Sequence, residues 1–405
     1  MKKLVTICLV LAWVVSLGCK RDQIIPELSP GRDKLLLAGL AVESIEHLKL
    51  AEIDEKDKAE PRALLLIAYS HALAKNLAYL KSSNLETEYR NQRNARLNAL
   101  NADEIDEIFK VLNERHRVQK SAQQVLILKG TPVIPLIVED FLNNRHPNAH
   151  KGFDDVLTQI GSDGLEQLIT AIDAAETPKN VKRRLIRVIG DIGDPAIQDE
   201  LEALKKTIND EALLTEINVV LYRIGNKAYK NEIEAGLDSN NVLVRQASAR
   251  SMVLLNKPAT SKLIVALKDT DDQVRRDIVK ALREHVDANA VDNLVHILTN
   301  NSSGNTKQGA VNTLEYYAEK GLADGLAPRL INLLTQTEIT NHEDRIRIVQ
   351  LLSTPILIKQ IEAADRYDNL PYRISDYYET KENNDLVKDE LIKLLRELPE
   401  DEQAE

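Results

Sequence analysis

The feature that most constrains the fold of this chain is a turn residue that recurs at an almost constant interval. The turns lie 31, 32, 32, 32, 30 and 34 residues apart, at Gly130, Gly161, Gly193, Gly225, Lys257-Pro258, Asp287-Ala288 and Gly321. A fixed period of this size is typical of repeat proteins. Glycine suits these positions because a helix often ends in a left-handed conformation that other residues adopt only with strain.

Each period has room for two short amphipathic helices. In the unit that begins at Pro258, an apolar face around Leu263 and Leu267 is followed by a polar run at 268–272 and then by a second apolar face. This second face contains Val274, Ile278, Ala281, Leu282 and Val286. Neither helix can bury its apolar face alone, so we expect neighbouring units to stack and share a core.

The start of the second helix resembles a known repeat family. Asp271-Asp272-Gln273-Val274-Arg275 and Asn241-Val242-Leu243-Val244-Arg245-Gln246-Ala247 are similar to that position in HEAT repeats, especially the short repeats of phycobilin lyases. In that family an Asp before the helix and an Arg within it form a ladder between repeats. The resemblance implies an all-α fold, a right-handed α-solenoid of about seven HEAT-like helix pairs preceded by an N-terminal helical domain. The unit near 288–320 departs from it, because residues 300–305 lengthen the loop and the Asp–Arg pair is missing.

The flanks differ from the array in character. We predict a tether at 20–32, an N-terminal helical domain at 33–129, the repeat solenoid at 130–353, a C-terminal helical cap at 354–398 and an acidic tail at 399–405. Within the N-terminal domain, two apolar helices are expected around 35–37 and 64–67. Two polar helices follow, one near 86–99 and a long one that begins at a capping box at Asn101 and continues toward Lys129.

Residues 1–19 have the parts of an export signal. Lys2 and Lys3 precede an apolar stretch of 14 residues, Leu4 to Leu17, and a helix that spans a bilayer needs roughly 20. The ending Ser16-Leu17-Gly18-Cys19 resembles a bacterial lipoprotein signal, although Leu is usual in place of Ser16. The resemblance implies a chain that is exported, lipidated at Cys19 and anchored to a membrane of the bacterial cell envelope. Cleavage without lipid and an uncleaved anchor are the alternatives.

Composition excludes several classes of function. A net charge of −10 without long runs of Lys or Arg makes nucleic acid an unsuitable partner. Loss of the signal would remove Cys8 and Trp13 and leave Cys19 as the one thiol. A disulfide scaffold, a thiol nucleophile and a cysteine metal site are therefore excluded.

The histidines form no pattern that predicts catalysis. His146 and His150 have a spacing that would suit a metal ion on a helix, but Pro147 and Asn148 favour a loop, and no acidic residue stands at a fixed offset. HEAT-like di-iron hydroxylases use repeated His-Glu pairs, whereas this chain has only His342-Glu343. Phycobilin lyases act in the cytoplasm, which does not fit an export signal. We therefore expect no catalytic residue, no metal and no cofactor.

Arginines are frequent in the second helices, which line the concave face of HEAT-like arrays. We name Arg245, Arg275, Arg276 and Arg283 as candidate partner-binding residues. One interpretation is a basic surface for an acidic protein or peptide. The other is the structural Asp–Arg ladder together with solvated helix charge. Four tyrosines near the C-terminus allow a similar choice between a packed cap and a binding patch, at Tyr367, Tyr372, Tyr377 and Tyr378.

Three functions fit these observations. The first is a protein-binding scaffold at the envelope that holds a protein or peptide on its concave face and catalyses nothing. The second is an enzyme, or a subunit that matures one, of the HEAT-like lyase type. The third is a structural component of an envelope assembly.

Overall fold

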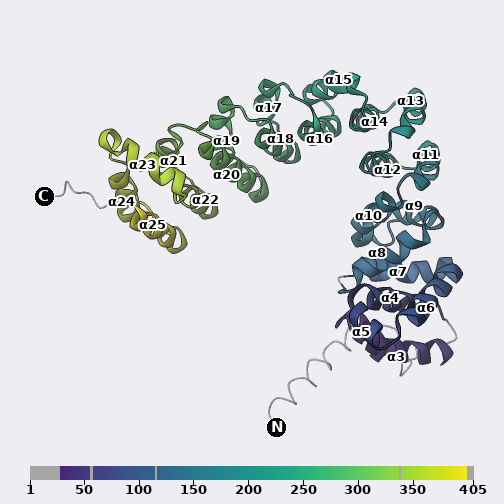
Figure 1. Cartoon of the computed structure of the whole chain (residues 1–405). Coiled ribbons are helices and arrows are strands. Elements are labelled where there is room, and N and C mark those ends of the chain that lie inside the picture. Colours follow the sequence, from purple (N-terminus) through teal and green to yellow (C-terminus); the bar gives the residue numbers. More distant parts are fainter. Residues whose placement is uncertain (1–27, 55–57, 115, 337–338, 399–405) are drawn as a thin grey trace, which may run out of the picture. The chain divides into compact units, whose positions relative to one another are not determined.

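The computed structural model describes residues 28–54, 58–114, 116–336 and 339–398, and the regular elements in these residues are all helical (Figure 1). The chain divides into two compact units, residues 1–194 and residues 195–405. None of the helices in the described ranges has the length and apolarity needed to cross a bilayer. The export signal with Cys19, the tether up to residue 27 and the acidic tail at 399–405 lie outside the described residues.

Unit 1 is built around one helix that is buried on almost every side. This helix, α4, has an uninterrupted buried run from Ala63 to Leu73, and it packs against α3, α6, α7 and α8. Two HEAT-like pairs, α9/α10 and α11/α12, complete the unit. The helices are α2 (Leu28–Leu36), α3 (Ala41–Asp54), α4 (Ala59–Lys75), α5 (Leu77–Ser82), α6 (Glu86–Ala99), α7 (Ala102–Asn113), α8 (Gln119–Lys129), α9 (Ile134–Asn143), α10 (His150–Ile160), α11 (Leu165–Asp173) and α12 (Lys179–Ile192).

Three expectations for this unit need correction. Helix α2 begins at Leu28, so five residues assigned to the tether are helical; Pro30 is tolerated because it lies in the first turn, where backbone N–H groups have no helical acceptor. The region expected to form two apolar helices forms three, α2, α3 and α4. The long helix from Asn101 is two helices, α7 and α8, because α8 folds back to pack on both α7 and α4. The predicted cap is confirmed: the Asn101 side chain accepts a hydrogen bond from the Glu104 N–H at 3.0 Å.

Unit 2 consists of further helix pairs in two rows. The first helices of the pairs are α13, α15, α17, α19 and α21, and the second helices are α14, α16, α18, α20 and α22. Their bounds are α13 (Gln198–Thr207), α14 (Glu211–Arg223), α15 (Lys230–Ala235), α16 (Val242–Ser251), α17 (Thr260–Ala266), α18 (Asp272–Glu284), α19 (Val291–Ile297), α20 (Gly304–Glu319), α21 (Leu326–Gln336) and α22 (His342–Leu352). With the two pairs of unit 1, the described residues between 130 and 353 hold seven pairs. The predicted α-solenoid of HEAT-like pairs is confirmed.

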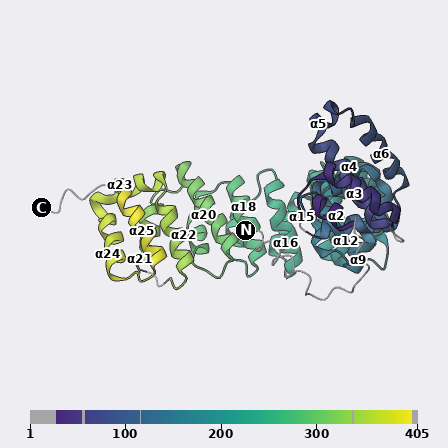
Figure 2. The ribbon, with the colours of Figure 1, turned by 90° about the horizontal axis from the view of Figure 1, so that it is seen from below.

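The second helices of unit 2 lie side by side, each packed on the next, from α14 to α22 (Figures 1 and 2). The row then continues into α25 (Asp385–Glu397), which packs on α22, while α23 (Pro355–Asp368) and α24 (Leu370–Thr380) pack on α21. One core runs through the unit, and the predicted apolar face of α18 is part of it, since Val274, Ile278 and Leu282 have no exposed surface. Tyr377 joins this core, whereas Tyr372 is 59% exposed.

The turn glycines have the positive φ that was expected, but the left-handed helical conformation is found at Gly193 and not at Gly130 or Gly161, where ψ is −145° and −146°. Gly130, Gly161, Gly193 and Gly321 have φ between 67° and 76°, and Gly225 has φ 125°. A side chain at these positions would be strained even where space is available. After Gly130, Thr131 and Pro132 open a 3₁₀ turn that has no side-chain cap.

Candidate binding surface on the second helices

The second helices of unit 2 begin in the same way. A short polar side chain caps each of them and accepts a hydrogen bond from a backbone N–H of the first turn, which contributes about 1 kcal/mol per helix. In α16, α18, α20 and α22 the caps are Asn241, Asp271, Ser303 and Asn341. Four residues after each cap stands a basic residue: Arg245, Arg275, Lys307 and Arg345.

These four basic residues join each pair to the next one. The Nε of Arg245 donates to Asp269 Oδ2 at 2.7 Å in the following loop, and its Nη1 donates to the Ser239 carbonyl at 2.9 Å in its own loop. Arg275 repeats the arrangement, with Nε donating to Ser302 Oγ at 2.8 Å and Nη1 to the Asp269 carbonyl at 2.6 Å. The side chain of Arg275 is therefore almost fully buried, at 4% exposed.

The ladder also passes through the unit where the sequence indicates a break. Lys307 takes the place of the arginine, and its Nζ forms a buried ion pair with Asp344 on the next second helix. Arg347 donates to the other oxygen of Asp344 at 2.9 Å. The loop before α20 is only one residue longer than the loop before α18, since it runs from 298 to 303 rather than from 267 to 271. The longer loop and the missing Asp–Arg pair are therefore confirmed, and the Lys307–Asp344 ion pair takes the place of the missing pair.

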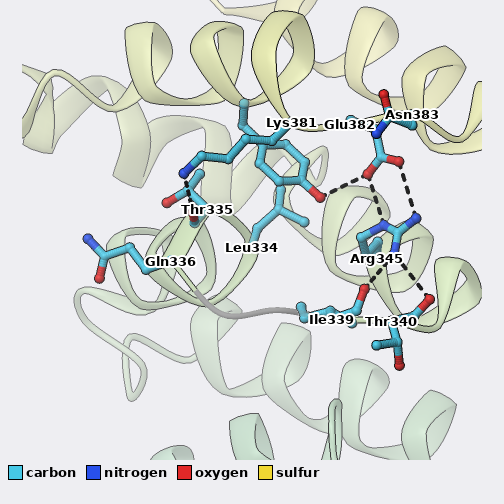
Figure 3. Close-up of a pocket in the computed structure, with 10 residues that line it drawn as sticks. Leu334, Thr335, Gln336, Ile339, Thr340, Arg345, Lys381, Glu382 and Asn383 are labelled. Carbon is cyan, nitrogen blue, oxygen red and sulfur yellow. Dashed lines mark hydrogen bonds and ion pairs between the residues drawn. The ribbon is translucent and has the colours of Figure 1, made fainter.

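The last step of the ladder closes a cavity of about 430 Å³ between α21, α22 and the turn before α25 (Figure 3). Arg345 lies 2.9 Å from the buried carboxylate of Glu382, and the Tyr377 hydroxyl donates to the same carboxylate at 2.8 Å. Burial works against ionisation of Glu382, but hydrogen bonds from Asn384, Tyr377 and Arg345 outweigh it and lower the pKa of the carboxyl. These residues connect α22 to α24 and to the turn before α25, so the cavity lies at a joint between neighbouring helix pairs.

The four predicted partner-binding residues fall into two classes. Arg245 and Arg275 are engaged in the ladder. Arg276 is partly exposed and forms no ion pair with a described residue, and Arg283 is exposed, with its guanidinium 5.7 Å from the centre of the Tyr316 ring. Partner binding by all four stays a prediction, but only Arg276 and Arg283 have side chains that are available to another molecule.

A second set of positions, also counted from the caps, defines a solvent-exposed surface. The fifth and ninth residues after each cap in α16, α18, α20 and α22 are all at least partly exposed. They are Gln246 and Arg250, Arg276 and Lys280, Gln308 and Asn312, and Ile346 and Gln350. This surface, the amide-basic face, carries four amides, three cations and one isoleucine but no carboxylate. The second helices that carry it lie on the inner side of the curve that unit 2 describes (Figure 1).

The amide-basic face has both fixed and available groups. Arg250 is held by both oxygens of the buried Glu216 carboxylate, at 2.8 and 2.7 Å. Lys280 lies 3.7 Å from Asp277, which is too long for a hydrogen bond, and its side chain is 66% exposed. The centre of this face on α18 therefore offers two cations, Arg276 and Lys280, that a partner can approach.

The two closely spaced histidines lie in unit 1 and have an acidic partner that spacing did not reveal. His146 Nδ1 is 2.6 Å from Asp140 Oδ2, and Asp140 has no exposed surface. The chain reverses between them through Asn144, which is left-handed at φ 50°. His150 lies in the same cluster, and burial followed by the charge of Arg184 lowers its pKa.

This cluster contains every phenylalanine of the chain. Phe109, Phe141 and Phe153 contact one another, with ring centres 4.5 and 5.9 Å apart for the two pairs that involve Phe153. Arg184 lies 4.7 Å from the centre of the Phe141 ring and binds Asp154 through two hydrogen bonds. In the described part of the chain, no three His, Cys, Asp or Glu side chains converge in a way that would hold a metal ion.

No protein-family model matches the chain, and no curated protein matches it in sequence. Solved structures of similar form include an engineered protein, at 17% identity over 91% of each chain with a TM-score of 0.35. Karyopherin Kap121p bound to the extreme C-terminus of the protein phosphatase Cdc14p matches at 12% identity over 94% of this chain and 49% of that chain, with a TM-score of 0.47. Kap121p bound to the SUMO protease Ulp1p matches at 11% identity over 89% and 45%, with a TM-score of 0.42. The chain spans about half the length of these karyopherin chains.

Proposed function

We propose that this protein is a non-catalytic binding scaffold of the bacterial envelope that holds a protein or peptide on the amide-basic face. The observation that carries the proposal is the composition of this face, in which eight outward positions on four neighbouring helices include no carboxylate although the whole chain is acidic. Amide side chains both donate and accept hydrogen bonds, which suits the main chain of an extended segment. The cations of α18 favour an acidic residue within that segment.

The separation of the arginines into ladder residues and available residues supports the same proposal. The ladder residues hold the repeats in register, so the amide-basic face is presented by helices that are fixed with respect to one another in unit 2. A rigid surface loses little conformational freedom when a partner binds. Arg276, unlike Arg245 and Arg275, can change partner without breaking a bond between repeats, whereas Arg283 also lies near the Tyr316 ring of α20.

The test is capture of partners from detergent-solubilised envelope by the chain and by two charge variants. The first variant combines Arg276→Glu, Lys280→Glu and Arg283→Glu on α18. The control combines Lys206→Glu, Lys268→Glu and Lys359→Glu, which lie on or beside first helices, are exposed and make no ion pair with a described residue. We expect the α18 variant to lose the captured protein and the control to retain it. Equal capture by the chain and both variants would contradict the role of this face.

The envelope location rests on the sequence of residues 1–19 and is tested separately. We propose that Cys19 carries the lipid, because it follows an apolar stretch and a small residue as in bacterial lipoprotein signals. Cys19→Ala is expected to abolish incorporation of a labelled fatty acid and to release the chain from the membrane fraction. If the unaltered chain takes up no label, the lipid anchor is refuted while the binding proposal stands.

A further inference from the structure

A groove lies on the first helices of unit 1, between α9 and α11. Its volume is about 540 Å³, larger than the cavity in Figure 3. The apolar lining comes from both helices, with Val138 and Leu142 from α9 and Ala171 and Ala174 from the end of α11. Leu142 is 38% exposed, so the groove presents apolar surface to water.

Ala171 of α11 and Ala174, which follows that helix, are the small residues of the groove lining. Ala171 and Ala174 stand where larger apolar side chains would fill the space between the helices. Closer to the turn, the same two pairs are in tight contact, since a Cβ at Gly164 would come within 2.6 Å of the Ile134 side chain. The pairs therefore close at one end and leave room at the other.

Three carboxylates surround this apolar groove. Glu139 belongs to α9, Glu166 to α11 and Glu176 to the segment before α12, and all three are exposed. None of their side chains forms an ion pair or a hydrogen bond with a described residue, and no basic residue lines the groove. Like charges around a concave apolar surface attract a cationic partner and repel an anionic one.

We infer that this groove docks a basic amphipathic segment of a partner protein, with an apolar side chain between α9 and α11 and flanking Lys or Arg residues against Glu139, Glu166 and Glu176. Its chemistry is the reverse of the amide-basic face, which has cations and no carboxylate. The two surfaces also lie on different helices of the pairs, the groove on first helices and the amide-basic face on second helices. The inference is independent of the proposed function, because it concerns another surface and another class of partner.

The experiment uses two synthetic peptides with the same apolar centre and one Trp each, one flanked by lysines and the other by glutamates. The chain from residue 20 onward contains no Trp, so Trp fluorescence reports on the peptide alone. We expect the lysine peptide to bind at least about tenfold more tightly than the glutamate peptide, because the rim attracts only the first. Equal binding of both peptides, or binding of neither, would overturn the inference.

Two variants and one control separate docking in the groove from general attraction to an acidic protein. Glu139→Lys, Glu166→Lys and Glu176→Lys together are expected to reverse the preference between the peptides. The control, Glu284→Lys with Glu319→Lys and Asp324→Lys, makes the same change in net charge at exposed positions of unit 2 and is expected to leave it unchanged. Ala171→Phe keeps every charge and fills the groove, so it should abolish binding of the lysine peptide. A control that loses the preference as completely as the rim variant, or an Ala171→Phe chain that binds normally, would refute the groove.

Discussion

Neighbouring second helices are joined in different ways in the two units. In unit 2 the join is positional from α16 onward, because a basic residue four places after the caps of α16, α18, α20 and α22 reaches the next loop or helix. In unit 1, α10 and α12 are joined by Arg184, which binds Asp154 and lies over Phe141. The first join repeats with the helix caps, whereas the second depends on an aromatic cluster found once in the chain.

This difference indicates which contacts hold the helices of each unit in place and what those contacts depend on. A ladder built from the same position in α16, α18, α20 and α22 holds the register of these helices while their outward positions vary freely. The cluster of unit 1 combines two histidines, Asp140 and the three phenylalanines in one local core, so its stability depends on protonation as well as packing. We therefore expect the two units to respond differently to substitution and to pH.

The largest effect is expected from Asp344→Asn. The buried ammonium of Lys307 would lose its counter-charge, and Arg347 would lose one of its acceptors. Breaking one side of a buried ion pair costs about 3 kcal/mol. Urea unfolding should show this loss of stability, and hydrogen exchange should place it in α20 and α22. The apolar double variant, Lys307→Met with Asp344→Leu, should recover most of it, and a loss of less than about 1 kcal/mol for Asp344→Asn would show that the ladder does not hold the repeats.

The next effect comes from two adjacent arginines of α18. Arg275→Ala leaves the Asp269 carbonyl and Ser302 without their donor and should cost about 2 kcal/mol. Arg276→Ala changes a partly exposed side chain without an ion pair to a described residue and should stay within about 0.5 kcal/mol. Urea unfolding of both variants measures the difference, and equal losses would remove the distinction between ladder and face.

A smaller effect is expected from Arg184→Lys in unit 1. Lysine cannot reproduce the two parallel hydrogen bonds to Asp154, but both side chains are about one-third exposed, so water compensates in part. We expect a loss of about 1 kcal/mol, which is less than for the buried pair of unit 2. A loss as large as that of Asp344→Asn would mean that the aromatic cluster, rather than the exposure of the ion pair, sets the strength of this join.

Acid should weaken unit 1 before unit 2. Burial, followed by the charge of Lys75 for His71 and of Arg184 for His150, lowers the pKa of both histidines from 6.5. The unfolded chain then takes up protons that the folded chain does not, so stability falls as the pH drops below about 6.5. In unit 2 the pKa of Glu382 is lowered from 4.5. Its contribution to the stability of the folded chain is therefore lost only when the pH falls below 4.5.

Hydrogen exchange at about pH 7.5 and pH 5.5, corrected for intrinsic rates, is the measurement. We expect faster opening at the lower pH for α4 and α10, which carry these histidines, and little change for α22. The double variant His71→Gln with His150→Gln should remove the difference. If lowering the pH from about 7.5 to 5.5 reduced the protection of α22 and left that of α10 unchanged, unit 2 rather than unit 1 would be the acid-sensitive unit.

The fold could be predicted from the sequence because its causes are local. The period of the turn glycines, the caps such as Asp271 and the apolar faces such as Val274 and Ile278 each act within one unit. The break between α7 and α8 could not be predicted, because it depends on the packing of α8 against α4. The start of α2 was obscured by Pro30, which usually marks a loop but is tolerated in a first turn.

The candidate binding surfaces were harder to predict from the sequence than the fold. Lys307 was missed because the family pattern asks for Arg, yet its position four residues after the cap at Ser303 is a signal that counting from caps would have found. The amide-basic face follows from the same count. The pairing of His146 with Asp140 depends on the left-handed turn at Asn144, and the α9–α11 groove depends on the distance between two pairs, so neither leaves a local pattern.

The most direct test of the binding claim is site-specific photo-crosslinking in intact cells. A photoreactive residue is placed at Gln308 and, separately, at Gln350, two exposed positions of the amide-basic face on neighbouring helices. Lys206, exposed on the first helix α13, and Lys359, exposed on α23, serve as controls. The account predicts that both second-helix positions crosslink to the same protein and that neither control does. Crosslinks to that protein from the controls but not from Gln308 or Gln350 would contradict it.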